Sequence, residues 1–237
     1  MDEQILIDSG HFADLGDEYV LNRLVEKQKK IKQDEQLKEV PDGRVFIFPS
    51  LQFNVIGFRE DEVTFTELLK FFQTPGSGLQ KLQLATGYLN LQKQYLKLIN
   101  NLTAECNILT SSPRANSFYQ AGRVKKFIPG LYRVNALNIL KQNKKKGGNI
   151  SVNEWSHGDW TFHGKGAWIY EEGSTVPQMT VIGSSNFSSR SNRRDTEAML
   201  YIVPECENFK AKLHDECEHL FAKSNKMTTE TILDKTN

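Results

Sequence analysis

The sequence lacks the features that mark several common classes of protein. Its 237 residues include 3 cysteines, Cys106, Cys206 and Cys217. These are too few and too scattered for a disulfide framework or a zinc site, so we expect reduced thiols. The chain also contains no run of about 20 apolar residues, the length that a membrane-spanning helix requires. We therefore expect no transmembrane helix.

An excess of charge of one sign is missing as well. The 30 Lys and Arg residues are balanced by 29 Asp and Glu residues, which leaves a net charge of +1. A protein dedicated to duplex DNA usually has a clear basic excess, so we expect no nucleic-acid partner. The first residues, MDEQILIDSGHFADLGDE, are acidic. They have neither the basic start and apolar core of a secretory signal nor the Arg-rich composition of a mitochondrial transit peptide.

The chain divides into three expected parts. Residues 1–43 are charged and helix-prone and end at the turn signal Pro41-Asp42-Gly43. Residues 44–223 alternate between strand and helix patterns, which predicts an α/β layered domain with a mixed β-sheet and helices on both faces. We expect residues 224–237 to form a disordered tail. After an extended stretch at 44–58, strands are expected at 81–89, 106–112, 150–155, 160–170, 179–185 and 198–203, and helices at 64–72, 91–99, 117–142 and 205–223.

The most specific pattern lies between Thr161 and Ile202. His163 and Lys165 stand two residues apart in an apolar and aromatic run. In a strand both side chains would leave the same face, because side chains alternate with period two. A Gly- and Ser-rich turn that ends in Asn186 follows the next apolar run. An imidazole, an ammonium and an amide aimed at one point are suited to handling a phosphate, whereas a single histidine in a strand is usually structural.

Four segments together resemble the phospholipase D superfamily. Its members carry His-x-Lys, a downstream Gly-Ser-x-Asn and a later Glu. Within the superfamily the chain is similar to the CDP-diacylglycerol–glycerol-3-phosphate 3-phosphatidyltransferases, the mitochondrial phosphatidylglycerophosphate synthases, and the similarity covers roughly residues 45 to 205. The segments are ATGYLNL (85–91), ILTSSPRANSFYQA (108–121), WTFHGKGAWIY (160–170) and TVIGSSNFSSRSNRRDTEA (180–198).

The resemblance implies a phospholipase D-like fold and a role for each matching residue. Two histidines of such proteins flank the phosphate: one forms a phosphohistidine and the other acts as general acid and base. His163 matches the second of these, or the nucleophile if two identical chains pair. Lys165 would neutralise the phosphate without a metal, and we expect no cofactor. Asn186, with Ser184 and Ser185, would bind phosphate oxygens, and Glu197 would hold the histidine tautomer.

The chain departs from the superfamily pattern in two ways. The pattern His-x-Lys-x4-Asp would place an Asp at position 170, where this chain has Tyr170. The second motif of the phosphatidylglycerophosphate synthases shares that departure. Family members also carry two His-Lys motifs, whereas only the C-terminal one is present here. His11 has no Lys two residues later. The chain therefore resembles the C-terminal half of such an enzyme.

The resemblance implies a transferase of phosphatidylglycerol and cardiolipin synthesis. Its substrates would be CDP-diacylglycerol and glycerol 3-phosphate, CMP would leave, and the protein would contact a membrane surface. A mitochondrial location follows from the resemblance alone. Two alternatives remain: a homodimeric phosphodiesterase or nuclease that joins one motif from each chain, and a catalytically incomplete fragment that binds phosphorylated ligands.

Three further features have more than one interpretation. Arg193, Arg194 and Asp195 could form a surface ion pair or part of an anionic entrance. The basic run from Lys141 to Lys146 is most simply a solvated loop, and contact with lipid headgroups is the alternative. Tyr88 could line the substrate site, but a packed strand aromatic is the simpler interpretation.

Overall fold

A single mixed sheet organises the computed structural model, which describes residues 43–119, 122 and 127–234. The expected helical segment at 1–43 lies outside these residues, apart from Gly43. Within the described ranges the strand order is β2-β1-β8-β7-β6-β3-β4-β5-β9. The strands are β1 (Val45–Phe53), β2 (Phe58–Arg59), β3 (Leu79–Thr86), β4 (Glu105–Ser111), β5 (Ile150–Trp155), β6 (Lys165–Glu171), β7 (Met179–Gly183), β8 (Thr196–Pro204) and β9 (Ser224–Lys226).

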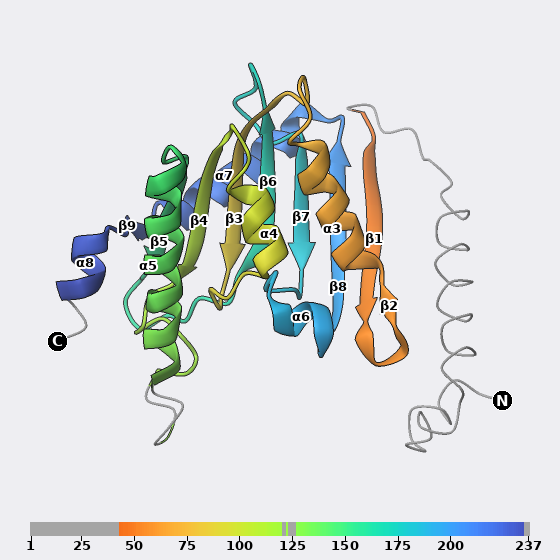
Figure 1. Ribbon diagram of the computed structural model, residues 1–237. Coiled ribbons are helices and arrows are strands. Elements are labelled where there is room, and N and C mark those ends of the chain that lie inside the picture. The colour runs from red at the N-terminus through yellow and green to blue at the C-terminus, as the bar shows by residue number, and fades with distance from the viewer. Residues whose placement is uncertain (1–42, 120–121, 123–126, 235–237) are drawn as a thin grey trace.

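Helices lie on both faces of this sheet, which confirms the expected α/β layered fold. Figure 1 shows α3, α4 and α5 in front of the strands and α7 behind them. The helical elements of the described chain are η2 (Asn54–Ile56), α3 (Glu60–Phe71), α4 (Lys93–Ile99), α5 (Ile128–Lys146), α6 (Ser189–Arg193), α7 (Glu207–Phe221) and α8 (Thr229–Asp234).

Each face of the sheet has its own hydrophobic core, because neighbouring strand residues point to opposite faces. In β6, Ala167 and Ile169 join the core beneath α3, α4 and α5. Trp168 and Tyr170 of the same strand join the core beneath α7. Full burial of a large apolar side chain contributes roughly 1.5–3 kcal/mol. The two cores therefore fix the register of β6, and with it the face to which Lys165 points.

One edge of the sheet collects the ends of many strands. β3, β4 and β5 are parallel to one another, so Thr86, Ser111 and Trp155 end at the same edge. We call this the carboxyl edge; it is the lower edge in Figure 1. β6 is antiparallel to β3 and begins at this edge, where Lys165 pairs with Thr86. β7 ends there and β8 begins there, because both continue the antiparallel pairing.

Two boundaries differ from the sequence-based expectation. β6 begins at Lys165 rather than near residue 160, so His163 precedes the strand. α5 begins at Ile128 and continues to Lys146, so the last basic residues of the run end a helix instead of forming a loop. Lysines are favourable in the last turn because they oppose the negative end of the helix dipole. Pro129 is tolerated because it lies in the first turn of the helix.

Residues 224–234 also differ from the expected disordered tail. β9 pairs with β5 in antiparallel register, and α8 follows it. Met227 is 4% exposed and Ile232 is 1% exposed, and both join the core on the α5 side. These two apolar side chains explain the order, because the short segment buries them against the domain.

Candidate active site

His163 and Lys165 meet at the carboxyl edge, although they do not share a strand. The Lys165 Nζ atom donates a hydrogen bond to the His163 carbonyl oxygen at 2.9 Å. The ring of Tyr88 contacts both: its centroid lies 5.2 Å from the imidazole centroid and 5.8 Å from Nζ of Lys165. The imidazole is exposed and Lys165 is half-buried. Both groups thus lie around the ring of Tyr88.

Gly87 determines how closely the His163 loop can approach the end of β3. A Cβ atom at this position would lie 3.2 Å from both Cα and Cδ2 of His163 and 3.5 Å from the Phe162 carbonyl oxygen. Such contacts are tighter than ordinary van der Waals separations between carbon atoms. Only a glycine lets the loop pack directly on the β3 terminus in this arrangement.

Asn186 lies in the turn after β7 and is held by the end of β3. The Thr86 hydroxyl shares its one proton among the Asn186 carbonyl oxygen at 3.1 Å, the Asn186 Oδ1 at 3.3 Å and the Tyr88 carbonyl oxygen at 3.2 Å. With Oδ1 accepting, the Nδ2 group is the donor end of the amide. It has no hydrogen-bond partner in the described part of the chain. The amide is therefore oriented and free to donate to a phosphate oxygen.

The next residue, Phe187, has a left-handed backbone with a φ of 53°. A non-glycine residue in this region costs on the order of 1–3 kcal/mol and persists only where its surroundings hold it. Its ring is buried and packs 4.7 Å from the ring of Phe65, measured between centroids. Ser185, which is 1% exposed, accepts a hydrogen bond from the Phe187 amide at 3.1 Å. Ser185 therefore shapes the turn. The sequence predicts that its hydroxyl binds a phosphate oxygen, but in the structure this hydroxyl is buried.

Glu197 lies on β8 and contacts Ser184 rather than the histidine. The Ser184 hydroxyl donates to the Glu197 carboxylate and accepts from the Ala198 amide at 3.0 Å. No hydrogen bond within the described residues joins Glu197 to His163. Burial lowers the pKa of Lys165, and the negative charge of Glu197 partly opposes this effect. Glu197 therefore acts on the ammonium through its charge, and the predicted contact with the imidazole is not made.

The electrostatic environment favours a neutral imidazole. Partial burial lowers the pKa of His163, and the nearby positive charge of Lys165 lowers it further. Burial also lowers the pKa of Lys165, and Glu197 opposes this effect. A histidine with a pKa below its ordinary value of about 6.5 is mostly neutral at pH 7. Its ring can therefore accept a proton or attack an electrophile.

Aromatic and basic residues that sequence reasoning assigned no function complete the rim. Tyr132 of α5 stacks on Tyr88 with 5.7 Å between the ring centroids. Burial, with the neighbouring Tyr88, raises the pKa of Tyr132 to about 12, and the positive charge of Arg190 opposes this shift. The Arg190 guanidinium pairs with Asp195 at 3.0 Å. Asp195 therefore forms a surface ion pair with Arg190, and that cation lies close enough to Tyr132 to influence the site.

Tyr170, which replaces the superfamily Asp, lies away from this site. It stands five residues after Lys165, and an odd separation places the two side chains on opposite faces of a strand. The Tyr170 hydroxyl is 3.2 Å from Nδ1 of His214 on α7. Tyr170 is therefore part of the core beneath α7, on the face of β6 opposite to Lys165.

These residues suit phosphate chemistry based on histidine. A neutral imidazole, an ammonium and an oriented amide lie at one edge, with a second cation at the rim. Such groups can bind a phosphate and stabilise the charge that develops during its transfer. Within residues 43–119, 122 and 127–234, no three His, Cys, Asp or Glu side chains gather in a way that could hold a metal ion.

Comparison with solved structures shows the phospholipase D-like fold. Phosphatidylserine synthase of Haemophilus influenzae Rd KW20 superposes with a TM-score of 0.65 at 20% identity, over 80% of this chain and 41% of that one. Nuc of Salmonella typhimurium, a phospholipase D family member, superposes with a TM-score of 0.51 at 10% identity, over 78% of this chain and 99% of that one. The fold and the His-Lys site therefore define a phospholipase D-like protein.

Sequence comparison then gives the family. The mitochondrial CDP-diacylglycerol–glycerol-3-phosphate 3-phosphatidyltransferase of Gallus gallus is 36% identical over 211 residues, which are 86% of this chain and 36% of that protein. The Homo sapiens enzyme is 34% identical over 194 residues, 81% of this chain and 34% of that protein. No family model matches the chain. The chain belongs to the family of these phosphatidyltransferases, and it spans about a third of the length of these curated relatives.

Proposed function

We propose that the protein takes part in transferring a phosphatidyl group from CDP-diacylglycerol to glycerol 3-phosphate, as the C-terminal catalytic part of such an enzyme. The product would be phosphatidylglycerophosphate, a precursor of phosphatidylglycerol and cardiolipin. The names of its relatives support these substrates. The observation that carries the proposal is the placement of His163, Lys165 and the Asn186 amide at one edge of the sheet.

The chemistry proceeds in two steps that keep atoms and electrons in balance. A histidine nitrogen attacks the lipid phosphorus, the bond from phosphorus to the CMP oxygen breaks, and CMP leaves with the electron pair. A hydroxyl of glycerol 3-phosphate then attacks the phosphohistidine, and a base removes its proton as the nitrogen–phosphorus bond breaks. His163 acts as the acid and base, and the nucleophilic histidine comes from a second His-Lys motif outside this chain. Lys165 and Asn186 stabilise the phosphate during both steps.

Partner and location follow from the same family assignment. The relatives from Gallus gallus and Homo sapiens are named mitochondrial, so a mitochondrial location is proposed for this chain. No helix in the described part of the chain is both long and apolar enough to cross a bilayer. Access to a diacyl substrate then takes place by contact with a membrane surface.

The test is CMP release from CDP-diacylglycerol in detergent micelles, measured with and without glycerol 3-phosphate on this chain combined with the part of the enzyme that supplies the second His-Lys motif. We expect release that depends on the acceptor and that falls at least 10³-fold in His163→Asn, because that variant removes the proton carrier. The matched control is His219→Asn, an exposed histidine of α7, which should retain full turnover. Turnover that persists in the His163 variant would contradict the proposal.

A homodimeric phosphodiesterase remains the second candidate because of one observation. The alignment with Nuc covers 99% of that chain, so this fold alone can make up a whole polypeptide. Sedimentation combined with hydrolysis of bis(p-nitrophenyl) phosphate distinguishes the two candidates. A dimer that cleaves this diester but releases no CMP from CDP-diacylglycerol would favour the phosphodiesterase.

A further inference from the structure

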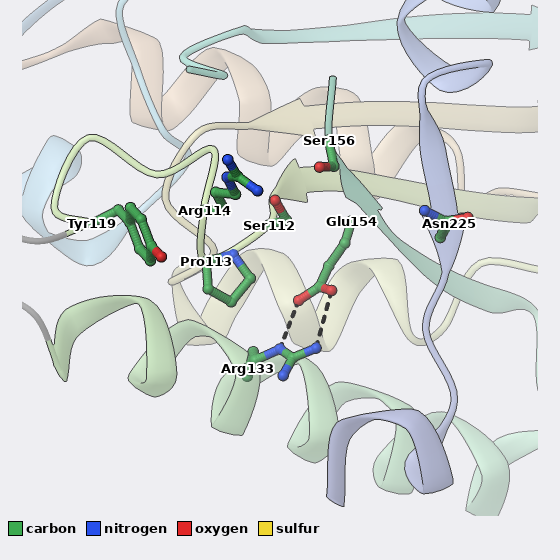
Figure 2. Close-up of a pocket in the computed structure, with 8 residues that line it drawn as sticks. All are labelled: Ser112, Pro113, Arg114, Tyr119, Arg133, Glu154, Ser156 and Asn225. Carbon is green, nitrogen blue, oxygen red and sulfur yellow. Dashed lines mark hydrogen bonds and ion pairs between the residues drawn. The ribbon is translucent and has the colours of Figure 1, made fainter. Parts of the chain in front are cut away.

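A cavity opens at the carboxyl edge, where β4 and β5 end. Its volume is about 350 Å³, which lies within the 300–1,000 Å³ typical of small-molecule sites. Figure 2 shows side chains from β5, β9, α5 and the segments that follow β4 and β5 around it. The lining residues are Ser112, Pro113, Arg114, Tyr119, Arg133, Glu154, Ser156 and Asn225.

The segment from Ser112 to Tyr119 connects this cavity to the catalytic histidine. Three of its residues line the hollow directly after β4. The Ala115 carbonyl oxygen accepts a hydrogen bond from the Phe162 amide at 2.9 Å, one residue before His163. The Ser117 hydroxyl lies 2.6 Å from the Tyr88 hydroxyl. A ligand in the cavity therefore rests against the same segment that holds the His163 loop.

The charges of the lining favour a polar ligand with a phosphate. The buried Arg133–Glu154 pair forms a fixed floor, with two hydrogen bonds of 2.8 and 3.1 Å, and its charges cancel (Figure 2). Arg114 is different, because its side chain is 67% exposed and pairs with Asp159, which is 88% exposed. Exposed ion pairs contribute little free energy, so an incoming phosphate can replace the carboxylate at small cost.

The distance between the two sites selects the part of the substrate. Neighbouring strands lie about 4.8 Å apart, so β4 is roughly 10 Å from β6 and β5 roughly 14 Å. The strand order β6-β3-β4-β5 therefore separates the cavity from Lys165 by this span. In CDP-diacylglycerol a second phosphate and a ribose separate the reacting phosphorus from the cytosine, a comparable span when extended. Glycerol 3-phosphate is too short to occupy both places.

We propose that the cavity binds the CMP portion of the donor. This rests on the proposed function and assigns a place to the leaving group. Arg114 follows β4, on the side of the cavity nearer Lys165, and binds the phosphate of CMP, which is joined to the reacting phosphorus through one oxygen. The flat sides of Tyr119 and Pro113 pack along the base. Ser112, Ser156 and Asn225 hydrogen-bond the ribose and the edge of the base, since an amide offers both the donor and the acceptor that cytosine requires.

The proposal is tested by titrating CMP into the purified full chain by calorimetry, with no lipid and no turnover. We expect saturable binding of CMP that Arg114→Gln weakens at least tenfold, because a charge-assisted bond to phosphate is lost. Asn225→Leu should weaken the binding of CMP and reduce the preference of the protein for CMP over UMP. The matched control is Arg44→Gln, which removes an exposed arginine paired with Glu205 at the start of β1, and it should bind CMP as the wild type does.

Two results would overturn the assignment. If Arg114→Gln and Asn225→Leu both bind CMP as tightly as the wild type does, CMP does not occupy this cavity. If glycerol 3-phosphate displaces CMP one for one, the cavity is the acceptor site instead. Thermal unfolding of each variant shows that it is folded. Because the titration needs no catalysis, the cavity assignment and the proposed transfer reaction can fail independently.

Discussion

At the scale of single residues, the imidazole of His163 is positioned by backbone on one side and by an aromatic ring on the other. Because residue 87 is a glycine, the His163 loop can lie 3.2 Å from the point that a Cβ atom on this residue would occupy. The ring of Tyr88 contacts both the imidazole and Lys165. Neither residue carries a reacting group. Their effect on catalysis is geometric, and small displacements at a reacting centre have large kinetic consequences.

Gly87→Ala should impair the reaction while leaving the fold intact. The added methyl group pushes the His163 loop by a few tenths of an ångström, and we expect turnover to fall about 10–100-fold. The melting temperature should change by only a few degrees. The control is Gly130→Ala, where a Cβ would meet no atom within 4 Å. Wild-type turnover in Gly87→Ala would show that the close approach is unimportant.

Lys165→Gln should raise the pKa of His163. Burial is the larger cause of the lowered pKa and remains in the variant, but the repulsion from the ammonium is removed. The histidine then takes up its proton at a higher pH than in the wild type. Titration of the imidazole protons by NMR measures the shift directly. A pKa that stays the same or falls would exclude electrostatic coupling between the two groups.

The sequence singles out His163, Lys165 and Asn186 by their types and spacing, and the fold brings them to the carboxyl edge, while their catalytic roles stay a prediction. It could not show that Gly87 matters, since the reason is a contact with a residue 76 positions away. It also could not separate Ser184 from Ser185. Adjacent serines look alike in a motif, but only the fold shows that Ser185 is turned into the protein.

At the scale of elements, the C-terminal segment is part of the domain. β9 extends the sheet beyond β5, and Asn225 of this strand reaches the cavity at the carboxyl edge. Sequence reasoning placed most strands and helices between residues 60 and 221, because their periodicity is strong, but it missed α6 and began α5 and β6 too early. It missed β9 and α8 because two short elements with few apolar residues show no clear period.

Ile232→Ala should destabilise the whole domain by about 2–5 kcal/mol, the usual cost of emptying a buried aliphatic site. Ile232 is 1% exposed and joins the core on the α5 side. Urea unfolding followed by circular dichroism measures the change. Leu131→Ala, at a leucine of α5 that is 61% exposed, is the control and should stay within about 0.5 kcal/mol. An equally small effect at Ile232 would mean that the segment is not docked.

At the scale of the whole molecule, stability should depend on a buried acid of α3. Asp61 of α3 is 2% exposed and accepts a hydrogen bond from the Tyr201 hydroxyl at 2.9 Å. Burial raises the pKa of Asp61 to about 6, while the Tyr201 hydrogen bond opposes the shift. The folded protein therefore binds this proton more tightly than the unfolded chain, whose Asp has a pKa near 3.9.

This shift predicts that protonation of Asp61 stabilises the fold. The contribution is fully present below about pH 4 and is lost as the pH rises through about 6, on the order of 3 kcal/mol in total. Asp61→Asn should remove this pH dependence and be more stable than the wild type at pH 8. The free energy of unfolding of both proteins between pH 4 and 8 provides the test. Parallel curves for the two proteins would contradict it.

The exposure of the His163 ring has a consequence for the products. An imidazole that faces solvent is as accessible to water as to an alcohol. A phosphatidyl group held at this edge would therefore react by two routes. Hydrolysis would yield phosphatidic acid, and transfer would yield phosphatidylglycerophosphate. On this hypothesis, whatever covers the edge during the reaction sets that ratio. The test compares the yield of phosphatidic acid with the carboxyl edge exposed and with it covered. An equal yield in the two cases would exclude this explanation.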